Sequence, residues 1–65
     1  MGKALTMRER IAKEARMAYQ LLRDEGQSTS DARHSAYENT YDLFEDEGVA
    51  TDEIVAALAG FLSTS

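Results

Sequence analysis

The last helix-length stretch of the sequence contains nine consecutive residues without a polar side chain, from Ile54 to Leu62. A helix that is apolar on every side has to be buried on every side. A chain of 65 residues offers few places to bury such a helix. Nine residues are also too few to cross a bilayer, which needs about 20. The segment therefore either completes the core of a small domain or packs against a second chain.

The length of the chain places it near the lower size limit for a domain that folds alone. Cysteine is absent, so neither a disulfide nor a thiolate metal site can add stability. Oligomerisation is the remaining common source of stability for so small a chain. We therefore expect one domain over residues 1–65 that assembles into a homo-oligomer.

Glycines divide the chain into three expected helices. Proline is absent, and Gly26 and Gly48 each follow a segment with apolar residues at helical spacing. A glycine after the last helical turn supplies the left-handed residue at which many helices end. The pattern predicts an all-α fold, an up-down-up three-helix bundle, with helices over about residues 4–25, 29–47 and 52–62.

The same spacing predicts which residues of the first two helices face inward. In the first helix they are Ala4, Met7, Ile11, Ala15, Ala18 and Leu22, flanked by Tyr19 and Leu21. In the second helix they are Ala32, Ala36, Thr40 and Leu43, flanked by Tyr37 and Phe44. Ser28 and Thr51 are the expected N-caps of the second and third helices.

The two glycine turns have matching sequences. Residues 19–29 align with residues 41–51, and Tyr, Leu, Asp, Glu, Gly and Thr are identical at corresponding positions. We therefore expect the same helix–glycine–cap–helix turn to occur twice. Two copies are too few for a solenoid, and both duplication and convergence on one favourable turn would explain the match.

Charge is divided unevenly along the chain. All seven Lys and Arg residues lie at or before Arg33, whereas residues 34–65 contain seven acidic residues and no Lys or Arg. The net charge of −5 disfavours nucleic acid as a partner, because phosphate contacts need clustered Lys and Arg. The division instead favours contacts between the two halves, within one chain or between copies.

The apolar run near the C-terminal end is the candidate self-association surface. Ala56 and Gly60 are four residues apart, a spacing that lets a neighbouring helix approach closely. An exposed Gly60 would otherwise cost about 1 kcal/mol relative to alanine. In the alternative interpretation, the large side chains complete the monomer's core and the small ones face water. The candidate residues are Ile54, Val55, Ala56, Leu58, Gly60, Phe61 and Leu62.

The outer face of the second helix is the candidate partner-binding surface. It carries like charges four residues apart, each pair costing a few tenths of a kcal/mol. Either a solvated face or a docking surface for a basic partner explains them. The acidic residues are Glu38, Asp42, Glu45 and Asp46, and a neighbouring copy would offer Arg10, Lys13 and Arg16 as the basic counter-surface.

We expect no catalytic residue, metal site or cofactor. His34 is the only histidine and no glycine-rich phosphate loop is present, so the groups that an active site needs are missing. Aromatic residues beside Arg33 offer a stacking surface for a base or nucleotide, although the edge of the core explains them more simply. These residues are Tyr37, Tyr41 and Phe44.

The sequence therefore predicts a non-enzymatic, cytoplasmic protein that self-associates and binds and regulates another protein. By analogy of size and charge alone, such proteins are frequent among phage and mobile-element inhibitors of host systems. One alternative is a helix-turn-helix DNA-binding regulator, whose second helix would offer only Arg33 and His34. Another is an acidic mimic of nucleic acid. No contact with a membrane is expected.

Overall fold

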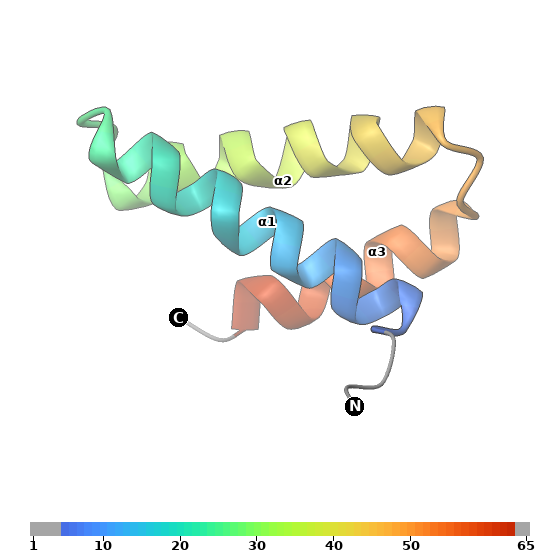
Figure 1. The fold of residues 1–65 in the computed structure, drawn as a ribbon. Coiled ribbons are helices and arrows are strands. Elements are labelled where there is room, and N and C mark those ends of the chain that lie inside the picture. The colour runs from blue at the N-terminus through green and yellow to red at the C-terminus, as the bar shows by residue number, and fades with distance from the viewer. Residues whose placement is uncertain (1–4, 64–65) are drawn as a thin grey trace.

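The computed structural model describes residues 5–63, and these residues form three helices and no strand. Helix α1 spans Met7–Asp24, α2 spans Thr29–Asp46 and α3 spans Thr51–Ser63. The chain reverses direction at each connection, so α2 runs back along α1 and α3 returns below α2 (Figure 1). The all-α fold predicted from the sequence is confirmed. Homo-oligomeric assembly stays a prediction.

Helix α1 begins at Met7 rather than near Ala4, because Thr6 is its N-cap. The backbone N–H of Glu9 donates to the Thr6 hydroxyl at 3.1 Å, and the backbone N–H of Thr6 donates to the Glu9 carboxylate at 2.9 Å. This reciprocal pair is a capping box, which satisfies two backbone donors at once. Ala4 lies outside the described residues.

The two glycine turns have the same hydrogen bonds, as their matching sequences predicted. Gly26 and Gly48 have φ angles of 101° and 90°, which side chains with a Cβ rarely adopt. In the first turn, the Gly26 N–H donates to the Arg23 carbonyl and the Gln27 N–H to the Leu22 carbonyl. The same two bonds recur at the corresponding positions around Gly48. Both turns are therefore Schellman motifs.

The N-cap prediction holds for α2 and fails for α3. The Ser28 hydroxyl accepts a hydrogen bond of 3.1 Å from the Asp31 backbone N–H. At α3, however, Thr51 is already helical. The carbonyl of Ala50 accepts the first helical bond, from the Ile54 N–H at 3.1 Å, so Ala50 occupies the N-cap position.

The core combines small buried residues of α1 and α2 with large ones from all three helices. Helices α1 and α2 pack extensively on each other, and small buried side chains let helix backbones approach closely. The fully buried alanines of these two helices are Ala15, Ala32 and Ala36. The largest fully buried side chains are Phe44, Ile11, Ile54 and Leu58.

Two leucines do not lie where the sequence predicted. Leu43 was expected in the inner stripe of α2 but is 45% exposed, and Leu21 at the flank of α1 is 63% exposed. The buried residues of α2 are spaced four apart, and each step of four residues advances about 40° around a helix. By the end of α2 the buried side has therefore rotated away from Leu43 to Phe44. The buried residues of α2 are Ala32, Ala36, Thr40 and Phe44.

Replacing Gly60 by alanine should stabilise the fold by about 1 kcal/mol, because glycine within a helix is unfavourable by that amount. Among the described residues nothing lies within 4 Å of a Cβ placed on Gly60. Gly48→Ala is the matched control and should cost about 1–2 kcal/mol, because its φ of +90° is strained for alanine. Urea unfolding followed by circular dichroism measures both. A loss of stability in Gly60→Ala would mean that another surface covers Gly60.

The capping box also predicts a pH effect. The backbone N–H of Thr6, and secondly its hydroxyl, hold the pKa of Glu9 below its ordinary value of 4.5. A carboxyl with a lowered folded-state pKa stabilises the fold above the unfolded pKa, and this contribution is lost as pH falls through the folded pKa. Glu9→Gln keeps the acceptor and removes the charge. Its melting temperature should lie below that of the natural chain at neutral pH, and the difference should shrink below pH 4.5. A difference independent of pH would contradict this assignment.

Candidate functional site

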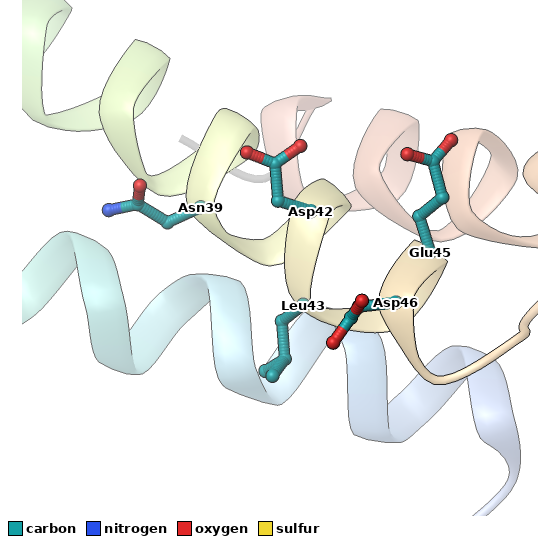
Figure 2. Close-up of a pocket in the computed structure, with 5 residues that line it drawn as sticks. All are labelled: Asn39, Asp42, Leu43, Glu45 and Asp46. Carbon is teal, nitrogen blue, oxygen red and sulfur yellow. The ribbon is translucent and has the colours of Figure 1, made fainter.

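The carboxylates predicted to bind a partner occupy exposed positions along α2. Asp42, Glu45 and Asp46 line a shallow hollow together with Asn39 and Leu43 (Figure 2). In this view Asp42 and Glu45 point away from α1, whereas Leu43 points toward α1. We call Glu38, Asp42, Glu45 and Asp46 the acidic face.

Most of the acidic face has no compensating charge. Within the described part of the chain, Asp42, Glu45 and Asp46 have no ion-pair partner. Glu38 lies 3.5 Å from Nε2 of His34, but both side chains are exposed, and the imidazole attracts the carboxylate only when protonated. No group of three His, Asp or Glu side chains among residues 5–63 is arranged to hold a metal ion. The carboxylates are thus a row along the helix and not a cluster.

The predicted basic counter-surface is divided by the fold. The Arg10 guanidinium lies over the Phe44 ring, 5.7 Å from its centroid. This cation–π contact joins α1 to α2 within one chain. Lys13 and Arg16 are exposed on α1. Of the predicted counter-surface, Arg10 therefore contacts an aromatic ring of its own chain. Lys13 and Arg16 contact no aromatic ring or carboxylate among the described residues.

The structure also divides the seven residues predicted for self-association. The large side chains that belong to the core of their own chain are Ile54, Leu58 and Phe61. Those that remain exposed are Val55, Ala56, Gly60 and Leu62. The interpretation of the run as a core helix therefore holds for the first group, and self-association stays a prediction for the second.

The exposed residues of α3 do not form one face. Val55 and Leu62, 42% and 38% exposed, are seven residues apart and share a side of the helix. Ala56 and Gly60 are four residues apart and share another side, at least about 100° around the axis. A single flat partner surface would not cover both pairs.

A second hollow lies between the first half of α2 and the end of α3. Helix α3 packs more extensively on α1 than on α2, and it diverges from α2 after the connection between them (Figure 1). Leu62 is the α3 residue that lines this hollow, and the α2 residues are Thr29, Ser30, Arg33, His34, Tyr37 and Glu38.

A third hollow continues along α2 and shares Tyr37 and Glu38 with the second one. It is also lined by Asn39, Tyr41 and Asp42. The rings of Tyr37 and Tyr41 are stacked, with centroids 6.4 Å apart and planes 11° from parallel. Both rings pack against the core. We call these two connected hollows the tyrosine groove.

The acidic face forms one edge of the tyrosine groove, because Glu38 and Asp42 belong to both. The stacking surface predicted near Arg33 lies here in part: Arg33 and Tyr37 line the same hollow, and Tyr41 the adjoining one. The prediction was wrong for Phe44, which is buried in the core. The contribution of Leu62 was not predicted. The sequence feature that could have indicated this role is the seven-residue spacing of Val55 and Leu62, which places both at the edge of the apolar stripe of α3.

No helix within the described residues is long and apolar enough to cross a membrane. The chain matches no family model, no curated protein and no solved structure. The interpretation of the site therefore depends on its geometry and charge.

Two leucines of α3 should respond very differently to a charge. Leu58 is fully buried, so Leu58→Asp should cost about 4 kcal/mol or more. That cost is comparable to the total stability of about 3–10 kcal/mol expected for a domain of this size. Leu62→Asp should cost about 1 kcal/mol or less, because Leu62 is partly exposed. Thermal unfolding by circular dichroism checks both, and a folded Leu58→Asp would refute the assigned core.

Proposed function

We propose that this chain is a non-enzymatic protein-binding module whose acidic face contacts a basic surface of another protein. The observation that carries the proposal is the row of exposed carboxylates on α2 with no ion-pair partner among the described residues. The row borders a groove with a partly buried aromatic floor. Such a combination of a desolvated apolar centre and a polar rim is typical of protein interfaces.

The arrangement of charge on α2 is locally unfavourable, and this also supports the proposal. Glu38 with Asp42 and Asp42 with Asp46 are like charges at i,i+4, which destabilise a helix. The last turn of α2 contains no basic residue, although the helix dipole favours cations there. Breaks of local rules are expected at functional positions. A basic partner would reduce the repulsion between the carboxylates and would also place cations near the C-terminal end of α2.

The alternative of a DNA-binding regulator is disfavoured by the same charges. If α2 entered the major groove, Arg33 would approach the duplex together with several carboxylates, which phosphates repel. Between Ile54 and Leu62 the exposed residues of α3, such as Val55 and Leu62, have no polar side chain that could form hydrogen bonds to base edges. Mimicry of nucleic acid remains compatible with the acidic face, and it differs in needing no contribution from the tyrosine groove.

Self-association is part of the proposal only for the side of α3 that carries Ala56 and Gly60. If two copies meet there, Gly60→Ala should weaken their association while stabilising the dissociated chain. Measuring the stability of this variant at two protein concentrations separates these effects. Regulation of the partner and a cytoplasmic location stay predictions from the sequence.

Neutralising most of the acidic face should weaken binding of the partner. The variant Asp42→Asn, Glu45→Gln, Asp46→Asn removes three unpaired charges and should bind about tenfold or more weakly, if each contact contributes about 0.5 kcal/mol. Its fold should be at least as stable, because a like-charge repulsion is lost. The readout is affinity capture from a lysate of the source cells, followed by identification and titration of the captured protein.

A matched control removes the same charge from α1 and its C-cap residue, by Glu14→Gln, Asp24→Asn and Glu25→Gln. This control should retain the partner that the natural chain captures. Equal retention by the variant of the acidic face would exclude both the proposed function and mimicry of nucleic acid.

A further inference from the structure

We propose that the tyrosine groove receives a basic amphipathic helix of another protein. The apolar side of that helix would rest on Tyr37 and Leu62, and its Lys or Arg residues would face Glu38 and Asp42. This inference rests on the proposed function and specifies the chemistry of the partner.

The groove has an apolar floor on one side and an apolar wall on the other. The stacked rings of Tyr37 and Tyr41 form the floor and are held in place by the core beneath them. Leu62 of α3 lines the same hollow as Tyr37, and Val55 lies two turns earlier on the same side of α3. Rigid aromatic side chains lose little conformational freedom on binding, so they are effective anchors for a partner.

The hollows follow one another along α2, which favours an elongated occupant. The two hollows of the tyrosine groove share Tyr37 and Glu38, and together they extend from Thr29 to Asp42. This stretch of α2 is about 20 Å long at 1.5 Å per residue. An amphipathic helix of several turns matches this length and presents apolar side chains at i, i+3, i+4 and i+7 to a groove.

The carboxylates at the edge of the groove determine which charge its occupant should carry. The edge of the groove formed by α2 continues from Glu38 through Asp42 to the rest of the acidic face, and it includes no Lys or Arg after Arg33. A neutral helix would bring no charge to compensate the carboxylates, and an acidic helix would be repelled by them. A helix with Lys or Arg beside its apolar stripe is complementary to this edge from Glu38 onward, and Arg33 at the beginning of the groove is the exception.

A second copy of this chain is a poorer occupant. Two acidic faces would repel each other, so the groove cannot pair with itself. The exposed basic residues of α1 are interspersed with Glu9, Glu14 and Asp24 on the same helix, and two of them, Arg8 and Arg10, already contact Glu53 and Phe44 of their own chain. The outer surface of α1 is therefore of mixed sign, and its complementarity to the acidic face is weak.

The probe is a fluorescent model peptide of about two heptads with Leu at the a and d positions and Lys elsewhere. A scrambled peptide of the same composition and a peptide with Glu in place of Lys are its controls. Fluorescence anisotropy with the full chain should show binding of the amphipathic basic peptide. We expect binding at least about tenfold weaker for the scrambled peptide, and none for the acidic one.

Matched substitutions locate the binding. Leu62→Ser and Glu38→Lys should each weaken binding of the basic peptide about tenfold. Leu21→Ser and Glu14→Lys make the same chemical changes on α1, at an exposed leucine and an exposed glutamate outside the groove, and should leave binding unchanged. Circular dichroism confirms that each variant is folded.

Equal binding of the scrambled peptide, or binding insensitive to Leu62→Ser, would overturn the inference, because either result means attraction by charge alone. The proposed function would survive that outcome if capture of the natural partner still depended on the acidic face. Light scattering tests the second copy. An oligomer that dissociates when Lys13 and Arg16 are changed to Glu, and that excludes the peptide, would also overturn the inference.

Discussion

The extensive packing of α1 on α2, two helices whose buried residues include several alanines, is the constraint on which the rest of the structure depends. Ala15, Ala32 and Ala36 are fully buried, and they fill so little space that the two helices supply few large core residues. Ile11 and Phe44 are the large fully buried side chains of α1 and α2, and α3 adds Ile54 and Leu58. The large side chains of the apolar run at residues 54–62 therefore lie mostly in the core of their own chain. A small domain needs this burial to offset the conformational entropy lost on folding.

The same packing explains why a groove remains open. Helix α3 lies mainly on α1, with the Phe61 ring against Tyr19 at a centroid distance of 6.3 Å. Helix α2 is consequently covered less extensively by α3 than α1 is. The rings of Tyr37 and Tyr41 pack on the core, and Glu38 and Asp42 of the acidic face line the same hollows. The groove and the charge are thus neighbours on the helix that α3 covers less.

Local signals in the sequence predicted the helices better than the surface. Gly26 and Gly48 ended helices as expected, because left-handed φ values favour glycine irrespective of the rest of the fold. The inward direction of α2 was partly wrong, since Leu43 and Phe44 differ by only 100° around the helix and tertiary packing decides between them. Likewise, helical periodicity places Leu62 near the apolar stripe of α3 but does not reveal how far α2 and α3 diverge. The acidic face was predictable because a row of carboxylates without Lys or Arg depends on the helix alone.

Binding and folding are necessarily coupled in such a small domain. Repulsion along the acidic face acts against α2, while the Ser28 cap, the Schellman turn at Gly48 and the contact of Arg10 with Phe44 hold the helix in place. A ligand that binds the folded chain stabilises it by RT ln(1 + [L]/Kd), and a basic ligand also removes part of the repulsion. Under the proposed function, the exposed charge therefore lowers the stability of the free chain relative to that of the complex. Partner binding and the stability of this small domain would then be coupled through the same row of carboxylates.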